Sequence, residues 1–207
     1  MASQSGSQMP IGYLLVVEPR PAVFVGGLLV TTHRGRPLEF QATAPVTPNA
    51  TQQLLYGRTL RPHVCGEVIG AALLKKAATK PRLVLTSGVD SLDVRAHVTC
   101  PVAVLLDDGR GELEAGAARL AGGASAEESL PDDSPAGDAP AGGAPISDAI
   151  DPATRLELGP LKLAVHGDYL EDIGQIRSLG LDVEADLTEP LDRVAEALGQ
   201  TLRNDAA

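Results

Sequence analysis

The chain has 207 residues and a net charge of −10, and 43% of its residues are hydrophobic although only 2% are aromatic. Apolar side chains suffice for a packed core, but the aromatic surface on which bases or sugars stack is scarce, which disfavours single-stranded nucleic-acid and carbohydrate binding. The two cysteines, Cys65 and Cys100, are too few for a disulfide framework. No apolar run approaches the ~20 residues of a transmembrane helix. We therefore expect a cytoplasmic protein without membrane contact.

Positive charge is concentrated in the first half of the chain. Residues 1–110 carry eleven Lys or Arg and seven Asp or Glu, whereas the remainder is acidic. The densest basic group, from Lys75 to Arg82, ends a predicted helix, where cations suit the helix dipole without any phosphate ligand. Nucleic-acid binding is therefore disfavoured, although the basic first domain leaves it open, and a protein partner is the preferred expectation.

The first 43 residues predict three strands. Residues 11–17 and 23–31 are apolar and rich in β-branched side chains, and Pro19 and Pro21 between them mark a turn. Residues 38–43 then alternate between apolar and polar side chains. This pattern predicts an antiparallel meander, in which the pair Gly26-Gly27 marks either a bulge or a close backbone approach.

A change of period after the third strand predicts helices. Asn49 and Gln52 form a capping-box pattern, and Gly57 is a typical helix stop. A longer helix is expected from Pro62 to Ala78. Its apolar stripe consists of Val64, Cys65, Val68, Ile69, Ala72 and Leu73.

A short strand, a short helix and a second strand follow at residues 83–86, 90–98 and 102–106. The whole order is β-β-β-α-β-α-β, which predicts an α/β domain with a mixed sheet over residues 11–110.

The rest of the chain predicts a disordered acidic linker and a small C-terminal module. Residues 111–152 are mainly Ala, Gly, Ser, Pro, Asp and Glu, and they bury too little apolar surface to offset the cost of ordering the backbone. Residues 153–204 regain periodicity and predict a hairpin, a helix, a strand at 181–187 and a final helix that Thr188 caps. Because so short an α+β module has a marginal core, we expect it to dock on the first domain or on a partner.

Acidic residues follow three of the predicted strands, and they are the candidate catalytic residues: Glu18, Asp90 and Asp107. Ligands gather at the carboxyl ends of parallel strands, and clustered carboxylates hold Mg²⁺ for phosphoryl chemistry. The element order resembles the ribonuclease H-like fold, whose nucleases also place an acid on the first long helix. That resemblance implies a role for Glu67, which the helical spacing nevertheless turns toward solvent.

Zinc is not expected. His63 and Cys65 lie two residues apart on the predicted helix, so their side chains point in nearly opposite directions. Cys65 belongs to the apolar stripe, which places His63 on the other side. His97 and Cys100 repeat the same two residue types without completing a site, and the prediction is that no metal is bound.

The segment from Gly35 to Gly57 is the most distinctive in the chain. It contains Gly-Arg-Pro-Leu-Glu-Phe, a Pro-x-x-Pro-Asn crossover and Leu-Tyr-Gly, and it resembles uncharacterised bacterial proteins of planctomycete type. The resemblance implies no activity. Loop positions held stiffly by proline can form recognition sites. The candidate binding residues around this segment are Arg34, Arg36, Asn49, Tyr56 and Arg58.

Two functions remain open at this point. The preferred hypothesis is a non-catalytic protein-interaction or regulatory module that needs no cofactor. The alternative is a metal-dependent phosphoester hydrolase, similar to a nuclease, that would use Mg²⁺ at Glu18, Asp90 and Asp107. Glycine-rich phosphate loops and a Gly-x-Ser-x-Gly nucleophile motif are absent from the sequence.

Overall fold

The computed structural model describes residues 9–106, 150–181 and 186–204, and in these residues seven strands form one sheet. The strands are β1 (Ile11–Arg20), β2 (Val23–Thr31), β3 (Pro37–Ala42), β4 (Leu83–Thr86), β5 (Val102–Leu105), β6 (Arg155–Leu158) and β7 (Leu161–Val165). The α-helices are α1 (Ala50–Tyr56), α2 (Leu60–Pro62), α3 (Ala71–Lys76), α5 (Glu171–Ser178) and α6 (Glu189–Asn204). A π-helix, η2 (His63–Gly70), joins α2 to α3, and the 3-10 helices are η1 (Gly57–Thr59), η3 (Val89–His97), η5 (Pro152–Thr154) and η6 (Gly167–Tyr169).

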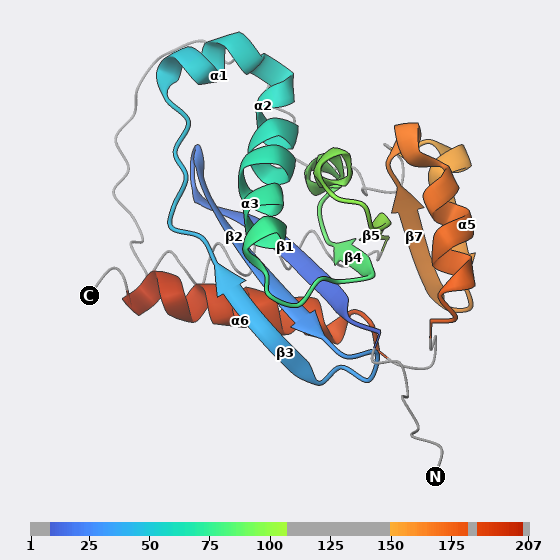
Figure 1. The fold of residues 1–207 in the computed structure, drawn as a ribbon. Helices are drawn as coiled ribbons and strands as arrows, with labels where there is room; N and C mark the ends of the chain where they lie inside the picture. Colours follow the sequence, from blue (N-terminus) through green and yellow to red (C-terminus); the bar gives the residue numbers. More distant parts are fainter. Residues whose placement is uncertain (1–8, 107–149, 182–185, 205–207) are drawn as a thin grey trace.

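The sheet is mixed, and its order is β3-β2-β1-β4-β5-β7-β6 (Figure 1). The first three strands form the predicted antiparallel meander, and β1, β4 and β5 run parallel. The α/β class with a mixed sheet is therefore confirmed. Because β1, β4 and β5 are parallel, the loops that follow them start at the same edge of the sheet, which we call the carboxyl edge.

Two adjacent glycines allow helices to pack closely on both faces of β2. A Cβ atom at Gly26 would lie 2.1 Å from Cγ2 of Ile69 in η2, and one at Gly27 would lie 2.8 Å from Cγ1 of Val194 in α6. Successive residues of a strand face opposite sides of the sheet, so each glycine accommodates one helix. The pair thus marks a close approach, which was one of the two alternatives that the sequence left open.

The predicted helix from Pro62 to Ala78 is found as the continuous segment α2–η2–α3, but its middle is π-helical. Val64, Ile69 and Leu73 are buried as expected, whereas Val68 and Ala72, predicted for the same stripe, are exposed. A π-helix has i→i+5 hydrogen bonds, which shift the side chains relative to the α-helical spacing that the prediction assumed.

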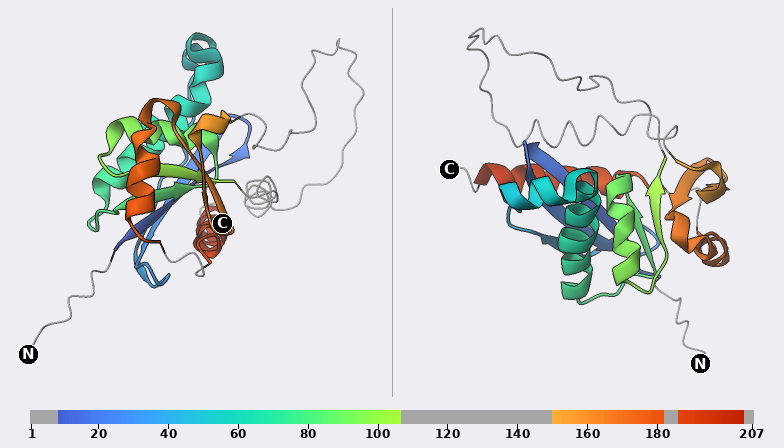
Figure 2. Two further views of the ribbon diagram at one scale, coloured as in Figure 1. Left: turned by 90° about the vertical axis from the view of Figure 1, so that its right-hand side faces the viewer. Right: turned by 90° about the horizontal axis from the view of Figure 1, so that it is seen from above.

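The C-terminal residues extend the sheet of the first domain. β7 pairs with β5 through Val104 and Ala164, and α6 crosses the face of β1 and β2 opposite to η2 (Figure 2). The sequence predicted that residues 153–204 form a small docking module; in the structure they supply two strands and a covering helix. Burial explains this arrangement, because the apolar β1 and β2 need cover on both faces.

Two details of the C-terminal prediction have different outcomes. The carboxylate of Asp186 accepts hydrogen bonds from the N–H groups of Thr188 and Glu189 and from the Thr188 hydroxyl, so Asp186 satisfies backbone donors at the start of α6, where Thr188 was the predicted cap. The predicted strand at 181–187 falls mainly on residues 182–185, which lie outside the described residues. The linker prediction for residues 111–152 also lies mostly outside them.

A buried ion pair ties α5 to η3. Nε and Nη2 of Arg95 donate to Asp172 at 2.7 and 3.0 Å, and the N–H of Val102 donates to the same carboxylate at 3.2 Å. Nη1 of Arg95 also donates to the carbonyl of Val98. The hydrogen bonds to Asp172 raise the pKa of Arg95, so the guanidinium stays positively charged at any ordinary pH.

Candidate functional site

Helix α1 projects from the body of the protein at the carboxyl edge (Figure 1). Its start has the predicted capping box: the Asn49 side chain accepts from the N–H of Gln52, and the Gln52 side chain accepts from the N–H of Asn49. Its end is the predicted Gly57, whose φ is +50°. No residue of α1 is buried, and Leu54 and Leu55 are 83% and 76% exposed. We call Leu54, Leu55 and Tyr56 the apolar tip.

Arg61, just after the tip, joins two of the predicted catalytic acids. Its guanidinium donates to Glu18 through Nη1 and to Asp90 through Nε at 2.9 Å. It also lies over the ring of Phe24, 5.5 Å from the centroid. Burial lowers the pKa of Arg61, but the hydrogen bonds and charges of Asp90 and Glu18 outweigh burial and raise it. The structure therefore brings Glu18 and Asp90 together, with a fixed positive charge between them.

This arrangement does not fit a Mg²⁺ ion. Mg²⁺ needs carboxylate oxygens at about 2.0–2.1 Å in octahedral geometry, and here the carboxylates of Glu18 and Asp90 both face a guanidinium. Asp107, the third candidate, lies outside the described residues. Glu67 is exposed, as its spacing predicted, and pairs with His63. In the part of the chain that the structure describes, no three His, Cys, Asp or Glu side chains are placed to hold a metal ion.

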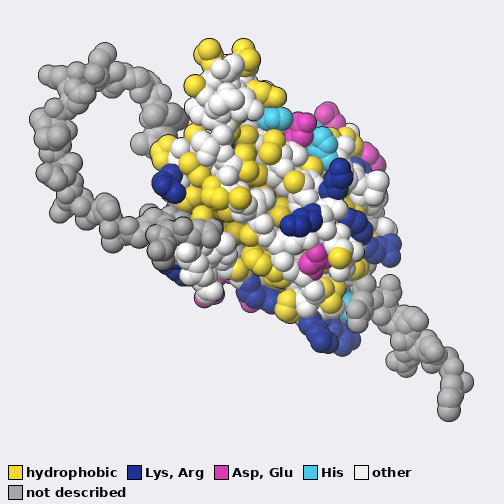
Figure 3. Space-filling view, turned by 60° about the vertical axis from the view of Figure 1, so that its left-hand side comes forward, with side chains coloured by type: hydrophobic (Ala, Val, Ile, Leu, Met, Phe, Trp, Pro, Cys, Tyr) yellow, Lys and Arg dark blue, Asp and Glu magenta, His cyan; other side chains and the backbone are white. Residues whose placement is uncertain are grey.

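Beside the apolar tip is a cleft of about 390 Å³ between the helical segment, η3 and the loop after β7. We call it the histidine cleft. Three histidines, three carboxylates and two tyrosines line it, together with Thr59 and Ala96: His63, His97, His166, Glu67, Asp93, Asp168, Tyr56 and Tyr169. Figure 3 shows histidine and acidic side chains gathered next to hydrophobic side chains that project from the body.

Contacts inside the histidine cleft pair imidazoles with carboxylates and aromatic rings. Nδ1 of His63 lies 2.7 Å from Oε2 of Glu67, and the His63 ring stacks on Tyr56 with 4.4 Å between centroids. Across the cleft, Nε2 of His166 lies 3.3 Å from Oδ1 of Asp93. The cleft therefore presents aromatic faces and carboxylate oxygens side by side, a combination suited to cations.

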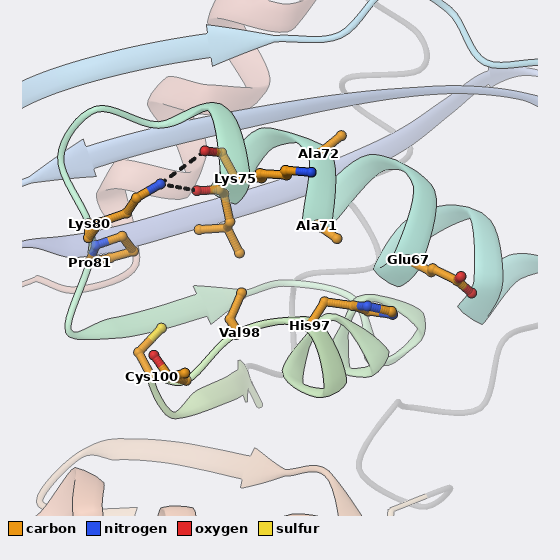
Figure 4. A pocket seen from close by; sticks show the side chains of 11 residues that line it. Glu67, Ala71, Ala72, Lys75, Lys80, Pro81, His97, Val98 and Cys100 are labelled. Atoms are coloured by element: carbon orange, nitrogen blue, oxygen red, sulfur yellow. Dashed lines mark hydrogen bonds between the residues drawn. The ribbon is translucent and has the colours of Figure 1, made fainter.

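A larger pocket of about 610 Å³ lies between α3 and the segment that follows η3 (Figure 4). Glu67 and His97 lie at one end and also line the histidine cleft. At the other end the ammonium of Lys80 donates to the carbonyls of Leu74 and Lys75, and so caps the helix. Burial raises the pKa of the Cys100 thiol, which disfavours the thiolate that a nucleophile requires.

The predicted binding residues are not brought together. Arg34 and Arg36 are exposed on the turn between β2 and β3, and Arg58 is exposed after the tip. Asn49 caps α1, and only Tyr56 among the five lines the histidine cleft. Cys65 is buried in the core, as its apolar stripe predicted.

Sequence reasoning missed the C-terminal half of the cleft. His166, Asp168 and Tyr169 follow β7 directly, and they reach the cleft because β7 pairs with β5. A usable signal was the cluster of polar side chains immediately after an apolar strand. Without the strand order, nothing placed that cluster beside His63.

Comparisons with known proteins give a fold likeness only. No protein-family model matches the chain, and no curated protein matches it. The chain is similar to two crystal structures of Ciona intestinalis endonuclease V in complex with inosine-containing DNA. Both have a TM-score of 0.46 and 13% identity over 97% of this chain, and 88% and 89% of those chains is covered. Among the described residues, no helix is long and apolar enough to span a membrane.

Proposed function

We propose that this protein is a protein-interaction module that binds a protein partner through the apolar tip. The observation that carries the proposal is that α1 projects with Leu54 and Leu55 almost fully exposed. Burying a leucine side chain contributes about 1.5–3 kcal/mol, so a partner that covers both residues gains considerable free energy. Clustered exposed apolar side chains are typical of interaction sites.

The way in which α1 is held supports this proposal. An isolated helix of seven residues is marginal in water, yet the capping box at Asn49 and the glycine stop at Gly57 fix both of its ends. Such a helix offers its apolar side chains in one conformation, which lowers the entropy cost of binding. No residue of α1 is buried, so its leucines are accessible to a partner.

The test is selection from a random peptide library on the immobilised full chain, followed by affinity measurement on purified peptides. We expect peptides whose affinity falls at least tenfold, about 1.4 kcal/mol, on L54Q/L55Q. Glutamine keeps the helix propensity of leucine and removes the apolar surface. The matched control is L170Q, because Leu170 is also exposed but lies outside the tip. Equal affinity for L54Q/L55Q and the unchanged chain would refute the proposal.

A second candidate, a metal-dependent phosphoester hydrolase, is favoured by one observation: Glu18 and Asp90 converge at the carboxyl edge. If the protein is an interaction module, neither the unchanged chain nor R61A, which frees the carboxylates of Glu18 and Asp90, should cleave single-stranded DNA or inosine-containing DNA in the presence of Mg²⁺ or Mn²⁺. Cleavage that requires the metal and is lost in both E18Q and D90N would establish the hydrolase.

A further inference from the structure

We infer that the histidine cleft receives an arginine side chain from the same partner segment that covers the apolar tip. This inference rests on the proposed function and names the chemistry of the partner. The occupant is a protein segment with an apolar residue for Leu54 and Leu55 and an arginine for the cleft.

Charge complementarity is the first argument. Glu67, Asp93 and Asp168 line the cleft, and no Lys or Arg is among its lining residues. The charge of these lining side chains suits a cation, and the Arg95 guanidinium, which lies over the Tyr169 ring, is the nearest positive charge that the cleft's contacts show. Glu67 and Asp93 each face one imidazole nitrogen, and a carboxylate has about four lone-pair sites. Acceptor capacity for a guanidinium therefore remains.

The aromatic rings favour arginine over lysine. Tyr56 stacks on His63 with an interplanar angle of 23°, which adds a planar wall beside the Glu67 carboxylate. A guanidinium stacks on such a wall and hydrogen-bonds a carboxylate in its own plane, whereas an ammonium does so less well.

The protein binds its own arginines in the same way. Arg95 lies over the ring of Tyr169, 4.4 Å from the centroid, and pairs with Asp172. Arg61 lies over Phe24 and pairs with Glu18 and Asp90. Both combine an aromatic face with carboxylate oxygens, and the histidine cleft offers the same combination.

Tyr56 connects the two surfaces. It is the last residue of α1, directly after Leu54 and Leu55, and it also lines the histidine cleft. The apolar tip and the acidic cleft are therefore neighbours, and Figure 3 shows histidine and acidic side chains close to hydrophobic ones. A single partner segment can contact the tip and place a side chain in the cleft.

The test uses the histidine ring signals of the full chain in NMR. The chain has four histidines, of which three line the cleft, and His33 on the β2–β3 turn serves as an internal reference. The probe is N-acetyl-arginine amide, and its control is N-acetyl-citrulline amide, which has nearly the same shape without the charge. We expect saturable shifts of His63, His97 and His166 with a dissociation constant on the order of 1 mM, no shift of His33, and no saturation with citrulline.

Variants locate the binding. E67Q/D93N should weaken the arginine probe at least tenfold, while E196Q, which removes an exposed carboxylate from α6, should leave it unchanged. Asp168 is almost fully exposed, so D168N provides a second cleft variant that preserves the fold, and it should weaken the probe two- to fivefold.

Three results would overturn the inference. They are equal shifts with citrulline, shifts of His33 as large as those in the cleft, and concentration-dependent shifts without any probe, which would assign the cleft to a second copy of this chain. The two proposals fail separately. L54Q/L55Q should leave binding of the arginine probe unchanged, because the probe does not contact the tip. If selected peptides need Leu54 and Leu55 but the arginine probe does not bind the cleft, only the arginine site is refuted.

Discussion

Helices α1 and α6 cover opposite extremes of burial within one small protein. Both begin with a side-chain cap, Asn49 for α1 and Asp186 for α6. Helix α6 buries residues along one stripe, including Leu191, Val194 and Leu198, whereas α1 buries none. Loss of α1 would expose no core residue, whereas loss of α6 would expose the core residues that it covers. The exposed apolar side chains on α1 therefore contribute little to the packing of the core.

The two arginine clusters show the same contrast. Arg95 and Asp172 belong to the C-terminal region's contact with η3, and the carboxylate of Asp172 is fully buried. Arg61 lies close to α1 and is half-exposed with Glu18 and Asp90. A buried pair leaves an uncompensated charge when one partner is removed, whereas an exposed pair leaves a solvated one. Stability should therefore depend on the C-terminal region much more than on α1 and its surroundings.

The largest effect is expected from D172A. It leaves the buried Arg95 guanidinium with only the exposed Glu171 at 3.8 Å as a counter-charge, which should lower the free energy of unfolding by about 3–5 kcal/mol in urea denaturation. The double variant R95M/D172N, which removes both charges with little change in side-chain volume, should recover most of this loss. A loss below about 1 kcal/mol in D172A would show that the pair does not hold the C-terminal region in place.

The second-largest effect is a loss of unfolding free energy at high pH, through Tyr13 in the part of the core that α6 covers. Burial raises the pKa of Tyr13 to about 12, from 10 in the unfolded chain. The unfolded state then loses its proton first, so the contribution of Tyr13 is complete below pH 10 and is lost as the pH rises toward 12. The loss amounts to roughly 2–3 kcal/mol. Y13F should show a shallower decline of unfolding free energy between pH 10 and 12, and an unchanged slope would contradict the prediction.

A smaller and local effect is expected from N49A. It removes the side-chain acceptor of the capping box, which should lower the free energy of local opening of α1 by about 1 kcal/mol. Amide hydrogen exchange in residues 50–56 should accelerate roughly fivefold, while exchange in β1 stays unchanged. Acceleration throughout the sheet would mean that α1 contributes to global stability after all.

The smallest effect on stability is expected from L54Q/L55Q. Because both side chains are exposed, the free energy of unfolding should change by no more than about 0.5 kcal/mol, measured by urea denaturation. The matched substitution of a buried residue, L198A in α6, should cost about 2–5 kcal/mol. A large loss in L54Q/L55Q would remove the distinction between the tip and the core.

Local structure could be predicted well from the sequence. The strands at 11–17, 23–31 and 102–106, the capping box at Asn49 and the stop at Gly57 all depend on side-chain alternation or on contacts within a few residues. The exposure of Glu67 followed from helical spacing. The same spacing was wrong for Val68 and Ala72, because the π-helical winding of η2 depends on packing against the sheet and η3.

The candidate site could be predicted only in fragments. Glu18 and Asp90 were expected at one edge of the sheet, yet no sequence pattern singled out Arg61, which joins them. The sequence indicated Tyr56 as a binding residue, but it did not indicate the other residues that line the histidine cleft. His166 and Tyr169 come from a part of the chain more than 100 residues away in sequence, so no local pattern linked them to Tyr56.

The sequence by itself determined the α/β class, the order of the strands along the chain and the ends of α1, since propensity, alternation and capping act over a few residues. Only the tertiary structure decided that residues 155–165 extend the sheet, that α6 covers β1 and β2, and that the histidine cleft lies beside the apolar tip. These features depend on strand pairing and on burial of two apolar faces, which bring distant residues together and which no short stretch of sequence encodes.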